Sequence, residues 1–300
     1  MTYSIVARDP DTGEMGVATQ SQALAVGSSV PFALPGYGVI ATQSMAEPLY
    51  GELGLEALRG GLTASEALTA LRSVDPHPER RQVGMVDGEG RIAVYTGDGC
   101  VAAAGHRVGP TCAALANLVA GPEVWDAMVT SYETGGGPLA PRLLAALHAA
   151  EDAGGDLRGR RSAAVMVVRA ERTGRPWHDR VVDLRVDDHA DPVTELDRLV
   201  AQRSRYQAVV VEFERALDGD PLTALAALDR IEAADPCSDP DQVLWRAVVQ
   251  ALAGREDDAA ASVGRLRDAS PQFLEAARRF GPAGLVPQDV LDRVLGLAER

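Results

Sequence analysis

The sequence predicts an α+β fold in which two antiparallel sheets lie between layers of helices, followed by an all-helical region. Two observations predict the first part. Short strands joined by tight turns extend from residue 2 to about residue 120, and paired helices interrupt the strands without the regular alternation of a βαβ protein. A third observation predicts the second part, because the pattern is only helical after Asp191. We therefore predict one domain over residues 1–200 and a helical domain over residues 201–300.

The chain opens with a predicted β-hairpin. Residues Thr2 to Arg8 alternate between a more polar face and an apolar face, as a half-buried strand does. The segment Asp9-Pro10-Asp11-Thr12-Gly13 is typical of a turn, because proline fixes φ, aspartate caps the turn and glycine tolerates positive φ. Residues Glu14 to Ser21 return as the second strand.

The segments that follow, up to residue 190, read as strands and pairs of helices. Gly60-Gly61 ends one helix, and a capping box at Thr63 and Glu66 begins the next, which runs to about Val74. We predict further strands over residues 38–44, 82–86, 91–96, 101–108, 112–119, 162–169 and 181–186, and further helices over residues 49–59, 122–132 and 138–153.

The helical region contains an internal repeat with an offset of 35 residues. Residues 216–220 (Ala-Leu-Asp-Gly-Asp) recur at residues 251–255 (Ala-Leu-Ala-Gly-Arg), and Ala224, Arg230, Ala234 and Pro236 recur at Ala259, Arg265, Ala269 and Pro271. The offset is close to the tetratricopeptide period of about 34 residues. The region therefore resembles two tetratricopeptide repeats, after a helix over residues 192–217 and before a final helix near residues 289–297. An ordinary alanine-rich helical bundle is the alternative.

Composition excludes several classes of function. No apolar run approaches the roughly 20 residues of a membrane helix, and the first residues lack the pattern of a signal peptide, so a cytoplasmic protein without membrane contact is expected. The net charge of −14 disfavours nucleic acid as a partner. All 29 basic residues are arginine, which excludes chemistry that needs a lysine. We expect no metal and no cofactor, and we expect Cys100, Cys112 and Cys237 to be inert thiols.

Thr2 is the first candidate catalytic residue. Removal of an initial methionine is common when the next residue is small, so a mature chain that begins at Thr2 is expected. An N-terminal threonine supplies both nucleophile and base, because its α-amine, with a pKa of about 8, takes the proton of its own hydroxyl. Ser4, on the same face of the strand, is the competing hydroxyl. The alternative is a Met-Thr start without catalytic meaning.

A glycine- and arginine-rich segment at residues 154–163 is a candidate binding loop. Its glycines permit close approach of the backbone, and its exposed amides could bind an anion. Its arginines, Arg158 among them, could hold a carboxylate with two hydrogen bonds. The alternative is a solvated loop after the end of a helix.

The segment from Asp183 to His189 places three acids and a histidine at the end of a predicted strand. Asp187 and His189 are candidates for general acid–base catalysis or for binding a substrate amine. A magnesium or calcium site at the three acids is a weaker reading. The alternative is that Asp188 or Asp191 caps the following helix while His189 lies on the surface.

Polar residues inside otherwise apolar strands form the last group of candidates. Such residues are costly to bury unless they are paired, so they either line a site or satisfy one another across strands. They are Gln20-Ser21-Gln22, Gln43-Ser44, Arg80-Arg81-Gln82 and Asn117.

Several motifs together resemble one known family over roughly residues 1–200. They are Thr2 to Asp9, Gly16-Val17-Ala18 with Ala25-Val26-Gly27, Arg81 to Gly84, Gly105-His106, Asn117 with Ala120-Gly121, Gly154-Gly155-Asp156 with Arg158-Gly159 and Ser162-Ala163, and Asp183 to His189. The chain resembles the family called domain of unknown function 1028, which is placed in the N-terminal-nucleophile (Ntn) hydrolase superfamily.

The resemblance implies a four-layer αββα sandwich and amide-bond hydrolysis. It implies that Thr2 is the nucleophile and that backbone amides or side chains such as Gln43 or Asn117 hold the oxyanion. Asp156, Arg158, Ser162 and Arg81 are the remaining candidates for substrate binding. The chain departs from proteasome-like members of the superfamily because it has no lysine.

Two main functional hypotheses follow. The first is an amidohydrolase that acts on a small polar or acidic amide, with Arg158 and Arg81 recognising anionic groups of the substrate. The second is a binding or scaffold protein without turnover, whose helical tail recruits a protein partner. A hydrolase that uses Ser4 or His189 is a third and weaker reading. Exposed sheet edges make a homodimer a reasonable expectation.

Overall fold

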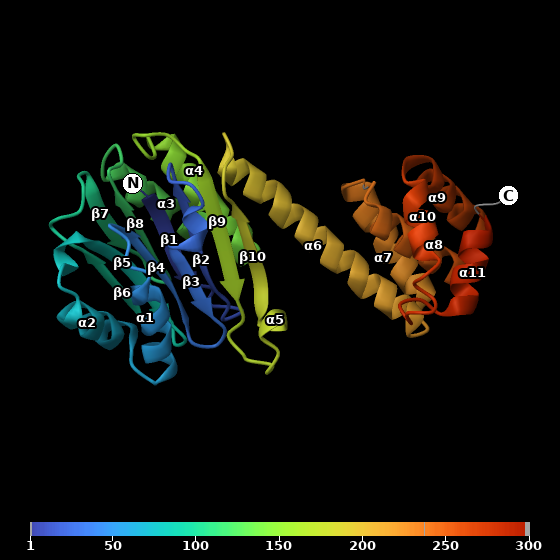
Figure 1. Ribbon diagram of the computed structural model, residues 1–300, viewed down its shortest axis with the longest axis horizontal. Helices are drawn as coiled ribbons and strands as arrows, with labels where there is room; N and C mark the ends of the chain where they lie inside the picture. Colours follow the sequence, from blue (N-terminus) through green and yellow to red (C-terminus); the bar gives the residue numbers. More distant parts are fainter. Residues whose placement is uncertain (1, 237, 298–300) are drawn as a thin grey trace. The chain divides into compact units, whose positions relative to one another are not determined.

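The computed structural model describes residues 2–236 and 238–297, and the chain divides into two units, Met1–Val200 and Ala201–Arg300 (Figure 1). The first unit combines antiparallel sheets with helices, and the second is helical. The predicted mixed α+β class with a helical C-terminal region is therefore confirmed.

The larger sheet of the first unit has six strands in the order β10-β9-β2-β1-β8-β7, and all neighbouring strands are antiparallel. Its central strand β1 is the first strand of the chain. The strands are β1 (Thr2–Arg8), β2 (Met15–Ser21), β7 (Ala104–Val108), β8 (Cys112–Asn117), β9 (Ser162–Val168) and β10 (Arg180–Val186).

The smaller sheet has four antiparallel strands in the order β3-β4-β5-β6. They are β3 (Pro31–Leu34), β4 (Gly38–Ser44), β5 (Arg81–Asp87) and β6 (Ile92–Thr96). The two sheets face each other across an apolar core that includes Val6, Val17 and Val39. At Gly84 a Cβ atom would lie 2.9 Å from Leu115 Cδ2 and 3.3 Å from Val6 Cγ2, so glycine permits the close approach of the sheets.

Helices cover the outer faces of both sheets. Helices α3 (Glu123–Thr134) and α4 (Leu139–Asp152) pack on the six-stranded sheet, and α1 (Leu49–Arg59) and α2 (Ala64–Val74) pack on the four-stranded sheet. Alternate residues of each strand point to opposite faces. Tyr3, Ile5 and Ala7 therefore belong to the core under α3 and α4, whereas Thr2, Ser4 and Val6 face the other sheet.

The predicted elements of this unit agree with the structure to within a few residues at each end. The capping box at Thr63 and Glu66 is confirmed, because Glu66 N donates to Thr63 Oγ1 at 3.2 Å and Thr63 N donates to Glu66 Oε2 at 2.8 Å. The strand expected over residues 101–108 is shorter, since β7 begins at Ala104. The sequence pattern does not predict β3, two 3₁₀ turns (Val26–Ser28 and Pro78–Arg80) or the short helix α5 (Pro176–Asp179).

The helical unit contains the second part of α6 (Pro192–Leu217), then α7 (Pro221–Ala234), α8 (Pro240–Leu252), α9 (Glu256–Ala269), α10 (Pro271–Ala277) and α11 (Gln288–Gly296). The predicted offset of 35 residues separates the ends of α7 from those of α9, and Ala224 and Ala259 at equivalent positions are both fully buried. The equivalence stops at α10, which is shorter than α8.

Within residues 2–236 and 238–297, no helix is both long and apolar enough to cross a membrane. Cys100 and Cys112 are free thiols, and burial raises the pKa of Cys112 to about 12, so its thiol stays protonated at neutral pH. Cys237 lies outside the described residues. The homodimer stays a prediction.

Substitution of Gly51 tests how closely α1 packs on the smaller sheet. A Cβ atom at this position would lie 2.2 Å from Cδ2 of Phe32 on β3. Gly51→Ala should lower the free energy of unfolding by about 1–3 kcal/mol, because the helix must move away from the sheet. Chemical denaturation measures the change. Glu52→Ala, at the exposed next position, should stay within about 0.5 kcal/mol. An equal effect of the two substitutions would contradict the packing.

Candidate functional site

The polar site lies where the central strand begins. Because β1 is antiparallel to both of its neighbours, its first residue lies beside the last residues of β2 and β8, and Thr2 pairs with Asn117. The loops that follow β2, β4 and β8, and those that precede β5 and β9, meet at this end of the two sheets. The strand order therefore concentrates polar side chains around Thr2.

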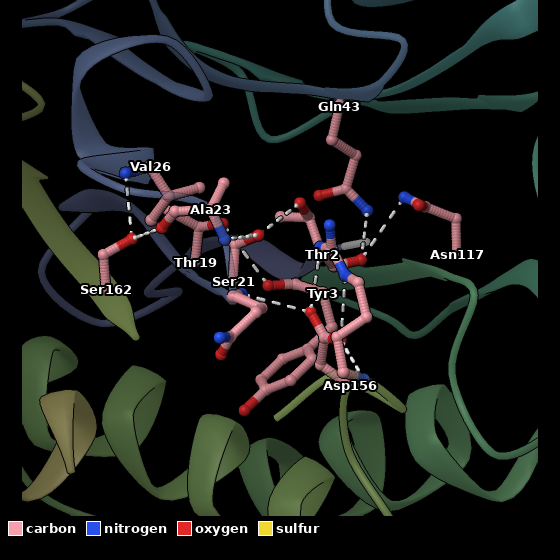
Figure 2. Close-up of polar contacts among 12 residues, drawn as sticks. Thr2, Tyr3, Thr19, Ser21, Ala23, Val26, Gln43, Asn117, Asp156 and Ser162 are labelled. Carbon is pink, nitrogen blue, oxygen red and sulfur yellow. Dashed lines mark hydrogen bonds and ion pairs between the residues drawn. The ribbon is translucent and has the colours of Figure 1, made fainter. Parts of the chain in front are cut away.

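Thr2 is 7% exposed, and both its side chain and its carbonyl have partners. Its hydroxyl Oγ1 donates to Ser21 Oγ on β2 at 3.2 Å, as Figure 2 shows. Ser21 Oγ also accepts from Ala23 N at 3.0 Å, which holds the serine in place. Ser21, which is itself held by Ala23, thus fixes the orientation of the Thr2 side chain.

Two buried amide side chains donate to the carbonyl of Thr2, and a third, Gln82, links them. Gln43 Nε2 on β4 donates to Thr2 O at 3.1 Å, and Asn117 Nδ2 on β8 donates to the same oxygen at 3.3 Å (Figure 2). Both amides also donate to Gln82 Oε1 on β5, at 2.8 Å and 3.0 Å. The network joins the two sheets, because Gln43 and Gln82 belong to one sheet and Thr2 and Asn117 to the other. Gln43 and Asn117 therefore position Thr2 in this structure, and their expected role in holding an oxyanion stays a prediction.

Ser4, the competing hydroxyl, is fully buried inside this network. Its Oγ lies 2.8 Å from Thr19 Oγ1 and 2.5 Å from Gln43 Oε1. The contact with Gln43 leaves the amide nitrogen of that residue to face Thr2. Ser4 thus orients Gln43 and is closed to solvent, which argues against its use as a nucleophile.

Two non-glycine residues beside the network have left-handed backbone conformations. Ser44, directly after Gln43, has φ 73°, and Leu118, directly after Asn117, has φ 52°. Such conformations cost roughly 1–3 kcal/mol each and occur most often at functional sites. The left-handed residues therefore end β4 and β8 directly after Gln43 and Asn117, the two amides that contact Thr2.

Asp156 ties the predicted binding loop to the same end of the sheet. Gly154 and Gly155, with φ 109° and 50°, turn the chain after α4, as glycine permits. Asp156 Oδ2 accepts from Gln22 N at 3.2 Å, just beyond β2, and Oδ1 accepts from Arg158 N at 2.8 Å. The Arg158 guanidinium forms an ion pair with Asp156 at 3.3 Å while its side chain stays 42% exposed. Asp156 therefore shapes the loop, and Arg158 reaches solvent from it, as Arg160 and Arg161 also do.

Ser162 holds the loop after β2 and does not contact Thr2. Its Oγ accepts from Val26 N at 3.0 Å and donates to Ala23 O at 2.6 Å (Figure 2). It is fully buried. Through Ala23, which binds Ser21, Ser162 supports the residue that orients the Thr2 hydroxyl.

Arg81 lies beside Gln82 on β5, but consecutive strand residues point to opposite faces. Its guanidinium forms two hydrogen bonds with Asp75, at 2.8 Å and 3.2 Å, and a third with Met45 O at 2.7 Å. The hydrogen bonds from Arg81 lower the pKa of Asp75 to about 2. Arg81 thus stabilises the loop after β4, and its charge is already balanced by a carboxylate.

The structure does not bring Asp187 and His189 to Thr2. Both follow β10, the edge strand, which lies three strands from β1, a distance of about 14 Å at the usual strand spacing. Asp187 forms an ion pair with Arg185 at 3.2 Å, and His189 Nδ1 accepts from Asp191 N at 3.0 Å. Among residues 2–236 and 238–297, no group of three or more histidine, cysteine or acidic side chains is arranged to hold a metal ion.

Of the residues that complete the site, Ser21 and Gln82 were among the polar candidates inside apolar strands, whereas Thr19 was not predicted. The choice between Arg81 and Gln82 required the face of the strand, which the register with β4 decides: Gln82 pairs with Gln43 and Arg81 with Ser44.

The fold and the site together define a mixed α+β protein with two facing antiparallel sheets and a buried hydroxyl, supported by amides, at the start of the central strand. The sequence profile of a family of unknown function (DUF1028) matches residues 2–196, and the chain belongs to this family. It is similar to the crystal structure of protein SPO2555 from Silicibacter pomeroyi, with 32% identity and a TM-score of 0.61, over 67% of this chain and 88% of that one. A comparison with curated proteins found no match.

Replacement of Gln43 tests the amide network. Gln43→Met keeps the approximate length of the side chain but removes both polar groups, so Ser4 Oγ, Gln82 Oε1 and the Thr2 carbonyl each lose one hydrogen-bond partner. We expect a loss of roughly 2–4 kcal/mol in the free energy of unfolding, because buried polar groups lose their partners. Chemical denaturation measures it. Gln22→Met, at a partly exposed position, should have little effect, and similar losses in both variants would argue against the network.

The Arg81–Asp75 pair predicts a dependence of stability on pH. The pKa of Asp75 is about 2 in the folded state against an ordinary value of 3.8, so the pair stabilises the fold above about pH 3.8. This contribution is lost as the pH falls from 3.8 towards 2. The difference in unfolding free energy between the native chain and Asp75→Asn should therefore be largest near neutral pH and shrink below pH 3.8. A difference that stays constant from neutral pH down to about pH 2 would contradict the assignment.

Proposed function

We propose that the protein is an Ntn-type amidohydrolase that cleaves a small polar or acidic amide, with Thr2 as the nucleophile. The observation that carries the proposal is the fixed position of Thr2: its hydroxyl and its carbonyl are both held at the start of the central strand by buried polar side chains from two sheets. The two facing sheets with helices on their outer faces are consistent with the αββα sandwich of that superfamily.

The proposed chemistry needs only groups of Thr2 and water. After removal of Met1, which lies outside the described residues, the α-amine takes the hydroxyl proton while Oγ1 attacks the carbonyl carbon of the amide. The tetrahedral intermediate collapses as the amine passes the proton to the leaving nitrogen, and the C–N bond breaks. Water, activated by the same amine, then hydrolyses the acyl ester and releases a carboxylic acid.

The buried polar network supports a catalytic role more than a structural one. Buried amides and hydroxyls add little net stability even when they are fully hydrogen-bonded, and an apolar core would fold without them. What they provide is a rigid position for one hydroxyl, which is what nucleophilic catalysis requires. The left-handed residues Ser44 and Leu118 add backbone strain at the same place.

Of Arg81 and Arg158, the two arginines expected to recognise an anionic substrate, Arg158 is the better candidate. Arg81 is paired with Asp75 and its side chain is 12% exposed, whereas the side chain of Arg158 is 42% exposed. An anionic group of the substrate would meet the solvent-facing part of Arg158. Asp156 would fix the arginine, because it binds the guanidinium and the backbone of the same residue.

A binding protein without turnover is the second candidate. The observation that favours it is the low exposure of Thr2, 7%, which leaves little of the hydroxyl open to a substrate. In that case the network would be a conformational anchor, and the helical unit, with its tetratricopeptide-like offset, would recruit a protein partner.

Substitution of Thr2 separates the two functions. In a screen of small amides, Thr2→Ala should abolish hydrolysis, whereas Thr2→Ser should retain it, because serine keeps a hydroxyl and an α-amine. The rate should rise with pH through about 8, where the α-amine loses its proton and becomes the base. Thr12→Ala, in the turn at the opposite end of β1, should leave activity unchanged.

Intact-mass measurement completes this test. The active protein should lack Met1, since a blocked amine cannot serve as the base. Hydrolysis by a chain that retains Met1, or by Thr2→Ala, would refute the mechanism. The absence of turnover in a correctly processed, folded chain across the whole screen would favour the binding protein.

A further inference from the structure

The helical unit buries polar side chains in one place. Among its described residues, those that are polar or charged and buried are Arg205, Gln242, Gln250 and Ser262. All four line two cavities that share Glu232, Arg246 and Arg265 in their walls. Buried polar groups add little to the stability of a small helical unit, so their concentration along one groove indicates a site.

The groove is built mainly from one face of each of three consecutive helices, α7, α8 and α9, and α6 adds Arg205 and Val209 at its narrow end. Its wide part is a cavity of about 340 Å³, and its narrow end, of about 10 Å³, is large enough only for a water-sized group. Residues three or four positions apart share a helix face. Accordingly α7 contributes Leu225, Asp229 and Glu232, α8 contributes Arg246 and Gln250, and α9 contributes Asp258, Ala261, Ser262 and Arg265.

The acids of the groove are each paired with an arginine. Asp229 contacts Arg246, Glu232 pairs with Arg205 at 2.8 Å, and Asp258 pairs with Arg255 at 2.5 Å. Arg265 has no acidic partner among residues 2–236 and 238–297, and its Nη2 donates to Ser262 Oγ at 3.3 Å. Arg205 also pairs with Asp235 at 3.6 Å, so Arg265 is the arginine of the groove whose charge no described acid balances.

Hydrogen-bond donors without acceptors lie along the same wall. Ser262 Oγ donates to Gln250 Oε1 at 2.8 Å, which turns the other end of that amide, Nε2, away from Ser262. Within the described part of the chain, Arg246 Nη1 is buried without a partner. The guanidinium groups of Arg246 and Arg265 thus offer hydrogen-bond donors that the groove itself does not fully use.

We propose that this groove binds a small organic anion of charge −1 through its carboxylate. A carboxylate has two oxygens that match the fork of an arginine, and its charge would balance that of Arg265. Gln250 would donate to the second oxygen. The volume suits a ligand of the size of an N-acylated amino acid, with Leu225 and Ala261 beside its apolar part. The site is independent of the proposed chemistry at Thr2, because its walls belong to the helical unit alone.

A pair of probes that differ only in charge tests the proposal. N-acetylglycine and N-acetylglycinamide have nearly the same shape, but only the first carries a carboxylate. In calorimetric titrations of the full chain, N-acetylglycine should bind at least about tenfold more tightly, since charged hydrogen bonds are worth about 1.5–3 kcal/mol. Higher ionic strength should weaken its binding.

Variants locate the site. Arg265→Ala should weaken N-acetylglycine binding by about tenfold or more, and Arg265→Lys should have an intermediate effect, because lysine keeps the charge but not the fork. Arg265 is exposed, so the substitution should not unfold α9, and circular dichroism checks this. Arg267→Ala, two residues further on the same helix and outside the groove, should bind normally.

Three results would overturn the proposal. The first is equal binding of the acid and the amide probes. The second is binding that Arg265→Ala and Arg267→Ala change equally. The third is no detectable binding of N-acetylglycine at roughly 10 mM, where even a Kd near 1 mM would give nearly full occupancy.

Discussion

The site depends on one interaction, the pair of amide hydrogen bonds from Gln43 and Asn117 to the carbonyl of Thr2. The bond from Gln43 joins the smaller sheet to the larger one, whereas Asn117 and Thr2 lie on neighbouring strands of the larger sheet. All three residues are buried. In such surroundings a hydrogen bond is stronger than in water, and an unpaired polar group is costly. The network is therefore satisfied in one arrangement, in which Ser4 orients Gln43 and Gln82 accepts from both amides.

The layers around the network explain why it can be rigid. The central strand carries apolar residues on the face that meets α3 and α4, while its polar residues share the other face with the smaller sheet. Towards the far end of the strands the contact between the sheets becomes apolar, through Val6, Val17 and Val39. The far end of the two sheets is thus held together by apolar packing. The end near Thr2 is held by hydrogen bonds between side chains, which require one alignment of the two sheets.

The helical unit also concentrates buried polar side chains in one place. Arg205, Gln242, Gln250 and Ser262 are buried where an ordinary bundle would place apolar residues, and they line a groove instead of filling a core. Its apolar core, which includes Leu244 and Val248, adjoins the groove, because Leu225, Leu228 and Val243 belong to both. Each unit of the chain therefore holds its own concentration of buried polar side chains beside a conventional core.

The sequence by itself determined most of the secondary structure, because periodicity, turn residues and caps act locally. The hairpin of Thr2 to Ser21, the capping box at Thr63 and the helix of residues 192–217 all follow from neighbouring residues. It also identified Thr2, Gln43 and Asn117 as candidates for one site. The short strand β3 was missed because its four residues carry too little periodicity.

Only the tertiary structure decided which candidates meet. Asp187 and His189 lie away from Thr2 because they follow the edge strand β10, and the sheet order puts β9 and β2 between β10 and β1. Gln82, and not Arg81, faces the site because the register with β4 sets the face of β5. Strand order and register arise from contacts between residues far apart in the chain. Local patterns do not contain that information, because one residue of register shift would turn every side chain of a strand to the opposite face.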